Sequence, residues 1–146
     1  MCLILNFYQK ILFFIQLRSF IAHSDWVNSL AILHSGDLVS GSDDSSIKIW
    51  DSQNGSLKDV LTNHSKPITC LLVLHNGNLV SGSDDRQIII WNHTRIEKIL
   101  TGHKDWIRCL TLLPNTDFVS GSEDGEIKIW TSNGDLKNTI KAHSEG

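Results

Sequence analysis

Apolar and polar residues alternate with a period of two along several stretches of this chain. Ile47 and Ile49 flank Lys48, and the segment EIKIW at 126–130 alternates in the same way. Such alternation is typical of half-buried β-strands. Clusters of Gly, Asp, Asn and Ser punctuate the stretches at the short intervals that antiparallel strands require. In the first unit the pattern predicts four strands, near Trp26 to Leu33, Asp37 to Ser42, Ser46 to Asp51 and Ser56 to Thr62.

The alternating stretches are copies of one repeat. The segments LVSGSDDSSIKIWD (38–51), LVSGSDDRQIIIWN (79–92) and FVSGSEDGEIKIWT (118–131) align without a gap. Their tryptophans, Trp50, Trp91 and Trp130, are 41 and 39 residues apart. A period of this length indicates a fold built from repeated units. The units open with His23, His64 and His103, and His143 begins a fourth.

The repeat resembles the WD40 repeat, which has four strands, an early histidine and a late Trp-Asp pair. Trp50 and Asp51 keep that pair, whereas Asn92 and Thr131 replace the aspartate in the later units. The resemblance covers residues 20–143. It implies an all-β fold, a partial and open β-propeller of three four-stranded antiparallel blades. We expect one domain at 20–146, with repeats at about 23–62, 64–101 and 103–141 and the start of a fourth unit.

The resemblance also implies a hydrogen-bonded set of His, Ser, Asp and Trp in each blade. Such a set satisfies polar groups that would otherwise be buried without partners. The carboxylate orients the imidazole, the imidazole meets the hydroxyl, and the hydroxyl accepts from the indole N–H. The sets fall on His23, Ser40, Asp44 and Trp50; on His64, Ser81, Asp85 and Trp91; and on His103, Ser120, Asp124 and Trp130.

The same residue types could suggest a hydrolytic triad or a metal site. A triad needs a single reactive serine with a base and an oxyanion hole, whereas this set occurs three times at one spacing. The repeated histidines are about 40 residues apart and lack the close ligand spacing of zinc sites. His34, His75 and His93 fall in turns or at strand ends, where surface positions are expected. We therefore expect no enzymatic activity, no metal and no cofactor.

Function is expected in the turns that differ between units, since folding already explains the repeated residues. Three residues after the histidines stand Trp26, Pro67 and Trp106. In the family, these turns and the turns with the aspartate lie on one rim, and aromatic anchors among mixed charges are typical of protein-binding surfaces. The alternative is that both tryptophans pack on a neighbouring blade. The candidate rim comprises Asp25, Trp26, Lys66, Pro67, Arg86, Gln87, Asp105, Trp106 and Glu126.

Charge and cysteine content narrow the class of partner and the compartment. Lys and Arg number 13 against 16 Asp and Glu, a net charge of −3, so no basic field for nucleic acid is expected. Cys2, Cys70 and Cys109 form no paired framework, which favours a reducing compartment. We expect the cytoplasm, with the nucleus as the alternative. Cys70 and Cys109 share one repeat position, where we expect both to pack on the innermost strand.

The ends of the chain raise separate expectations. Residues 1–19 form an apolar segment that fits neither a membrane span nor a signal peptide, and we interpret it as a remnant of a preceding blade. Three blades leave an arc, since closed propellers have about 4 to 8. Exposed blade faces, such as those with Ile47, Ile49, Ile127 and Ile129, would favour self-association. A gene fragment, an assembly of copies that completes a ring, and a non-functional remnant are the competing explanations. The lack of capping ends favours the first.

The sequence therefore predicts a non-enzymatic scaffold that binds protein or peptide partners through its rim. A substrate-recognition or assembly subunit of a larger enzyme complex, whether ubiquitin ligase, signalling or RNA-processing, would have the same features. A membrane-tethered adaptor that uses residues 1–19 is a further alternative, although membrane association is not what the pattern favours.

Overall fold

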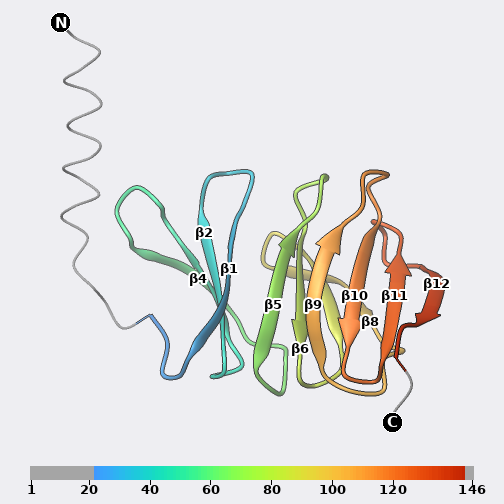
Figure 1. Ribbon diagram of the computed structural model, residues 1–146. Coiled ribbons are helices and arrows are strands. Elements are labelled where there is room, and N and C mark those ends of the chain that lie inside the picture. The colour runs from blue at the N-terminus through green and yellow to red at the C-terminus, as the bar shows by residue number, and fades with distance from the viewer. Residues whose placement is uncertain (1–21, 144–146) are drawn as a thin grey trace, which may run out of the picture.

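The computed structural model describes residues 22–143, which form three four-stranded sheets side by side (Figure 1). Each sheet is antiparallel, with its strands in chain order, and is called a blade below. The predicted segment 1–19, Cys2 and the last three residues lie outside the described residues.

Blade 1 contains β1 (Val27–Ile32), β2 (Leu38–Ser42), β3 (Ile47–Trp50) and β4 (Leu57–Leu61). Blade 2 contains β5 (Ile68–Val73), β6 (Leu79–Ser83), β7 (Ile88–Asn92) and β8 (Arg95–Leu100). Blade 3 contains β9 (Ile107–Leu112), β10 (Phe118–Ser122), β11 (Glu126–Trp130) and β12 (Leu136–Lys141).

The strands confirm the predicted all-β architecture of three four-stranded antiparallel blades in an open arc. In blade 1, each observed strand starts and ends within one residue of the predicted strand. The agreement has a physical basis, because turn residues end each run of alternating apolar side chains. No helix within residues 22–143 is long and apolar enough to cross a membrane.

The innermost strands lie next to one another, β1 beside β5 and β5 beside β9 (Figure 1). Each of these strands contains a β-bulge near its start, because the pairing shifts between Val27 and Ser29, between Ile68 and Cys70, and at the corresponding place in β9. A bulge re-aims the side chain of the unpaired residue. The unpaired residues are Asn28, Thr69 and Arg108.

The hydrophobic core lies between the blades. One cluster joins blade 1 to blade 2 and includes Ile47, Ile49 and Ile89; the other joins blade 2 to blade 3. The prediction that Ile47 and Ile49 lie on an exposed face is therefore wrong, because this side of blade 1 is covered by blade 2. Ile127 and Ile129 occupy the same repeat positions in blade 3, but no described blade covers them and they are only half-buried.

Candidate functional site

The middle blade shows the geometry of the predicted polar set most clearly. The indole Nε1 of Trp91 donates to Oγ of Ser81 at 2.8 Å. The Ser81 hydroxyl is 2.8 Å from Nε2 of His64, and Nδ1 of His64 is 2.8 Å from Oδ2 of Asp85. If the imidazole is neutral with its proton on Nδ1, each donor of these four side chains meets one acceptor. The set joins the turn before β5, strands β6 and β7, and the turn between them.

Blades 1 and 3 hold the same chain of contacts. The Trp-to-Ser distances are 2.8 Å for Trp50 to Ser40 and 2.8 Å for Trp130 to Ser120. The Ser-to-His distances are 2.7 Å for Ser40 to His23 and 2.8 Å for Ser120 to His103. The His-to-Asp distances are 2.9 Å, both for His23 to Asp44 and for His103 to Asp124. We call these twelve residues the quartets. Because each quartet serine is buried and engaged by both an indole and an imidazole, the quartets hold the segments of a blade together.

The quartet carboxylates are stabilised in their ionised form. Burial acts to raise the pKa of Asp85, but hydrogen bonds from His64 and from the backbone N–H groups of Gln87 and Ser65 hold that pKa below its ordinary value. The pKa of Asp124 is lowered by the same pattern of donors. Burial lowers the pKa of His103, against the opposing attraction of its aspartate. Both directions favour a neutral imidazole beside a carboxylate at pH 7.

A second serine in each repeat supports the turn that contains the quartet aspartate, and the sequence did not lead us to predict it. The hydroxyl of Ser83 donates to the Lys66 carbonyl at 3.1 Å and accepts from the backbone N–H of Asp85 at 3.0 Å. Ser42 and Ser122 make the equivalent pairs of hydrogen bonds in the other blades. The signal was present, because both serines of the Ser-Gly-Ser motif recur in all three units.

Among the described residues, one group brings three potential metal ligands together. Ligand atoms of His103, Asp124 and Glu126 lie within 4.8 Å of one another. The imidazole and Asp124 already bond each other, and Glu126 binds the ammonium group of Lys128 at 2.7 Å. A cation here would compete with that ammonium, so the quartet and the ion pair account for the arrangement. The expectation that the chain binds no metal stays a prediction.

The predicted rim tryptophans lie at the ends of the innermost strands, on the same side as the quartet aspartates. Trp26 is 78% exposed and therefore does not pack on blade 2, the neighbour of blade 1 among the described residues. Trp106 is 39% exposed, and the guanidinium of Arg108 lies 4.7 Å from the centre of its ring. The backbone N–H of each tryptophan donates to the preceding aspartate, Asp25 or Asp105, at 2.8 Å. The shared aspartate contact gives both turns the same local conformation.

A hollow of about 420 Å³ opens beside Trp26 at this rim. Of the predicted rim residues, it brings together Trp26 and Pro67. The bulge residues Asn28, Thr69 and Arg108 complete it together with Asp43 and Asp84. The sequence reasoning did not identify Asn28 and Thr69 as rim residues, although both stand five residues after a repeat histidine, as Arg108 does.

Charges around the hollow are only partly balanced. Arg108 contacts Glu123 at 2.6 Å and Asp84 at 3.4 Å. Burial raises the pKa of Asp84, and the neighbouring Asp43 and Glu123 raise it further while Arg108 opposes them. Three carboxylates, of Asp43, Asp84 and Glu123, thus lie around Arg108, and the charge of Lys66 also acts to lower the pKa of Asp84. Negative charge still exceeds positive charge here, which makes the hollow a favourable place for an added positive charge.

The other predicted rim residues do not line the hollow. Arg86 reaches the backbone carbonyl of Lys104 at 3.5 Å, and the backbone N–H of Gln87 donates to the quartet aspartate Asp85. The backbone carbonyl of Lys66 accepts a hydrogen bond from the hydroxyl of Ser83. Glu126 is turned toward Lys128 instead of toward the hollow. These residues support the rim, and the exposed tryptophans with the bulge residues form its accessible part.

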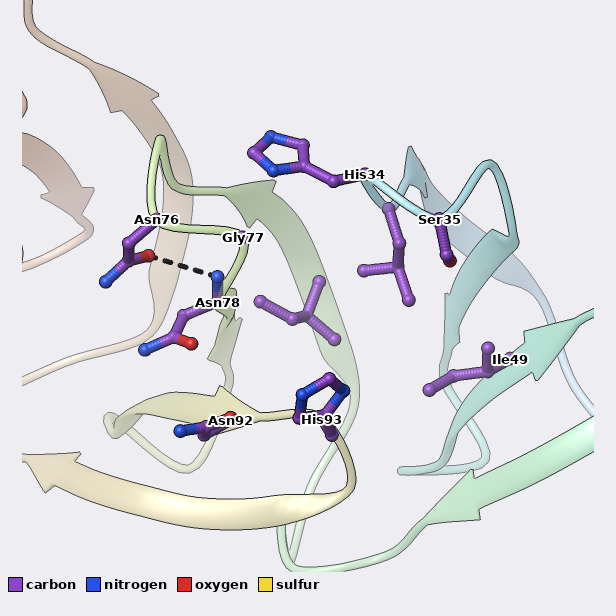
Figure 2. A pocket seen from close by; sticks show the side chains of 10 residues that line it. His34, Ser35, Ile49, Asn76, Gly77, Asn78, Asn92 and His93 are labelled. Atoms are coloured by element: carbon purple, nitrogen blue, oxygen red, sulfur yellow. Dashed lines mark hydrogen bonds between the residues drawn. The ribbon is translucent and has the colours of Figure 1, made fainter.

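A second hollow of about 270 Å³ lies between blades 1 and 2 at the opposite end of the strands (Figure 2). His34 and Ser35 approach it from blade 1, and Asn76 and His93 approach it from blade 2 (Figure 2). The amide of Asn78 is bound to Glu97, and Asn76 accepts from the Asn78 backbone, so these groups hold their turns together. The predicted surface positions of His34, His75 and His93 are exposed.

Cys70 and Cys109 share a repeat position but not an environment. Cys70 is buried between blades 2 and 3, and burial raises its pKa to about 11. Cys109 is exposed, contrary to the expectation that both would be packed, because no described blade covers blade 3 on that side.

Comparison with known proteins matches these repeats to one family. The family model described as "WD domain, G-beta repeat" matches residues 14–51, 55–92 and 94–131. The pre-mRNA-splicing factor PRP46 of Candida albicans is 49% identical over 45 residues, which are 30% of this chain and 12% of that protein. The chain therefore spans only a small part of this relative.

Solved structures share the fold. U3-55K matches with a TM-score of 0.80 at 23% identity, over 88% of this chain and 43% of that one. The WD40 repeats of RRP9 match with a TM-score of 0.78 at 23% identity, over 84% and 41% of the two chains. The WD40 β-propeller domain of Doa1 matches with a TM-score of 0.73 at 30% identity, over 82% and 42%. These matches confirm the propeller fold, and the chain spans less than half of each structure.

Proposed function

The chain belongs to the WD40 repeat family, and from this premise we propose that it is a non-enzymatic scaffold that binds protein or peptide partners through the rim around Trp26. The observation that carries the proposal is the 78% exposure of this tryptophan at the edge of a hollow. A large aromatic side chain left in water is the kind of residue that dominates binding energy once a partner buries it.

The neighbours of Trp26 indicate the chemistry of the partner segment. Asp43 and Asp84 line the hollow together with Arg108, which contacts Asp84 at 3.4 Å. Asn28 donates to the carboxylate of Asp43 at 2.6 Å and to the backbone carbonyl of Ile68, and Thr69 donates to backbone carbonyls. The carboxylates remain the main polar acceptors toward a ligand. We propose that the partner presents an apolar side chain to Trp26 and a cationic side chain to the carboxylates.

The test compares partner capture by the wild-type chain and by the double variant Trp26→Ala with Trp106→Ala. Proteins captured from cell extract are identified by mass spectrometry, and the affinity of each purified candidate is then measured. The double variant is expected to retain its circular dichroism spectrum and to lose at least about tenfold in affinity, since truncating an interface anchor commonly costs more than 1.4 kcal/mol.

The matched control is Leu57→Ala with Leu136→Ala, which removes two exposed apolar side chains from the outer strands β4 and β12. This control should bind like the wild type. If the folded tryptophan variant bound a partner with the same affinity as the wild type, the rim would not be the binding surface.

A second candidate function is an assembly subunit of an RNA-processing complex. The observation that favours it is the 49% identity over 45 residues with a pre-mRNA-splicing factor. Because pre-mRNA splicing takes place in the nucleus, this candidate goes with a nuclear location, whereas the expected cytoplasmic location stays a prediction. The expected absence of a nucleic-acid partner also stays a prediction.

Ribonuclease treatment during capture separates these candidates. Partners held by direct protein contacts should remain bound after treatment, and loss of all partners would show that RNA carries the association. Recovery of splicing proteins with the wild-type chain, but not with the tryptophan variant, would support the second candidate through the same rim.

A further inference from the structure

The hollow between blades 1 and 2 has a counterpart between blades 2 and 3, because both boundaries are built from the same repeat. The hollow lies at the opposite end of the strands from the rim (Figure 2). Its apolar wall consists of Leu33 and Ile49 of blade 1 and Leu79 of blade 2. The equivalent residues at the boundary between blades 2 and 3 are Leu74, Ile90 and Phe118. Both boundaries lie within the described residues, so they can be compared position by position.

A phenylalanine fills the boundary between blades 2 and 3. Phe118 is fully buried and packs in one hydrophobic cluster with Leu74 and Ile90. Leu74 is fully buried as a result. At the boundary between blades 1 and 2, the smaller side chain of Leu79 stands in the place of Phe118, and Leu33 is only partly buried. This boundary therefore has free volume where the other boundary holds an aromatic ring.

The turn of blade 2 beside the hollow is also shorter than its counterpart in blade 3. In blade 3, residues 131–135 connect β11 to β12, and Gly134 of this turn lies against blade 2. A Cβ atom on Gly134 would lie 2.6 Å from Cδ2 of Leu100 and 2.9 Å from Cδ1 of Ile90. In blade 2 only two residues separate β7 from β8. The short turn leaves Ile49, the equivalent of Ile90, on the wall of the hollow.

Polar side chains stand around the apolar wall. His34 reaches from blade 1 toward the turn of blade 2, where its Nδ1 lies 3.4 Å from the place of a Cβ atom on Gly77 (Figure 2). Asn92 and His93 line the hollow from blade 2. Among residues 22–143, these two imidazoles and the Asn92 carboxamide have no hydrogen-bond partner. Together they offer the donors and acceptors that a peptide group requires. The described residues that line the hollow include no Lys, Arg, Asp or Glu.

We propose that this hollow binds an aromatic side chain of a partner protein, in the place that the Phe118 ring occupies at the other boundary, and that His34 and Asn92 bind the peptide backbone beside it. The chain itself identifies the occupant, since an aromatic ring is what the same fold packs between Leu74 and Ile90. The uncharged lining fits an uncharged segment. The volume of about 270 Å³ is below the roughly 300–1,000 Å³ of sites for drug-sized ligands and suits a single side chain. The site is separate from the rim and goes beyond the proposed function.

A titration of the full chain with N-acetyl-phenylalanine N-methylamide, one residue flanked by its two peptide groups, tests the site. NMR spectra should show saturable shifts at the backbone amides of Gly77, Leu79 and His93. Nuclear Overhauser effects should connect the ring protons with the methyl groups of Leu33, Ile49 and Leu79. N-acetyl-alanine N-methylamide lacks the ring and should bind at least about tenfold more weakly.

Two results of this titration would overturn the proposal. Equal binding of the two compounds would show that the ring is not recognised. Shifts without saturation, or no shifts at all, would show that the full chain has no site for the ring, which includes the case in which other residues of the same chain already fill the hollow.

Leu79→Phe builds an aromatic ring into the hollow from blade 2, as Phe118 does from blade 3. The variant should keep its circular dichroism spectrum and bind the phenylalanine compound at least about tenfold more weakly. Leu79→Met is the matched control, because it changes the same side chain at nearly constant volume and should bind like the wild type. Equal binding by folded Leu79→Phe would place the compound elsewhere and overturn the proposal. If Leu79→Phe does not fold, the Overhauser contacts of the wild type decide the location.

The double variant His34→Ala with Asn92→Ala tests the contact with the peptide backbone. It keeps the apolar wall and should weaken binding of the phenylalanine compound roughly 2- to 10-fold, as expected for the loss of net hydrogen-bond energy. His75→Ala changes the histidine at the repeat position of His34 outside the hollow and should have no effect. Unchanged binding by the double variant would show that the ring is held without its backbone and would overturn the peptide assignment.

The variant Trp26→Ala with Trp106→Ala separates this site from the rim. It should bind the phenylalanine compound like the wild type, because the rim lies at the other end of the strands. Weaker binding by this variant would place the compound at the rim and overturn the proposal, whereas the proposed function at the rim would stand.

Discussion

Ile107 of blade 3 reaches so close to Gly82 of blade 2 that its Cγ2 atom would lie 2.7 Å from a Cβ atom at that glycine. The close approach lets adjacent blades pack their innermost strands tightly. Gly41 has the same relation to Ile68. The glycines of the Ser-Gly-Ser motif in blades 1 and 2 thus leave room for the isoleucine of the following blade.

Gly82→Ala should destabilise the chain by about 1–3 kcal/mol, because the added methyl group would crowd both Sγ of Cys70, at 2.6 Å, and Ile107 of blade 3. Gly121→Ala is the matched control, since its Cβ would meet only Cys109 of its own blade in the single chain. Urea unfolding at low protein concentration measures both. Equal losses for the two variants would show that the contact between blades is not the cause.

Asp85→Ala should lower the free energy of unfolding by about 1–3 kcal/mol, because it leaves the buried imidazole of His64 without its acceptor. For a domain of this size each kcal/mol corresponds to a fall of about 2–4 °C in Tm. Asp59→Ala removes an exposed aspartate on β4 and serves as the control. An unchanged Tm for the Asp85 variant would show that the quartet does not stabilise the blade.

Acid should destabilise the chain in two steps. The pKa of His103 is lowered from its ordinary value of 6.5, so the unfolded state binds a proton first, and stability present above pH 6.5 is lost as the pH falls below it. The pKa values of Asp85 and Asp124 are lowered from 3.8, so a further loss follows below about that pH. Thermal unfolding between pH 8 and pH 3 checks this order, and a Tm that rises between pH 7 and pH 5 would contradict it.

Cys70 should react far more slowly than Cys109 with a thiol reagent at pH 8. Burial raises the pKa of Cys70 to about 11, so little thiolate is present, and blade 3 also blocks access. Labelling of the dilute native chain followed by peptide mass spectrometry measures the two rates. Equal rates would mean that blade 3 leaves blade 2 frequently.

The repeat made most of the fold predictable. Each strand combines alternating side chains with terminating turn residues, so the strand bounds of blade 1 follow from local sequence. Which faces of a blade are buried by a neighbouring blade could not be predicted in the same way. Ile47 and Ile127 are equivalent in sequence, and only the presence of a following blade separates a buried from a half-buried side chain.

The candidate site was predictable in part for the same reason. Trp26 and Trp106 stand out because they differ from Pro67 at one repeat position. Asn28 and Thr69 were missed because a β-bulge directs them to the hollow, and the pairing shift that makes the bulge leaves no mark in the alternation of apolar residues.

The tautomers of His23, His64 and His103 test the central claim that the quartets are architectural. Two-bond ¹H–¹⁵N correlation spectra should show each of the three imidazoles in a single tautomer, with the proton on Nδ1 and with Nε2 accepting from the quartet serine. If these imidazoles instead averaged between both tautomers, as histidines in water do, the quartets would not exist in solution and the account of this chain would fail.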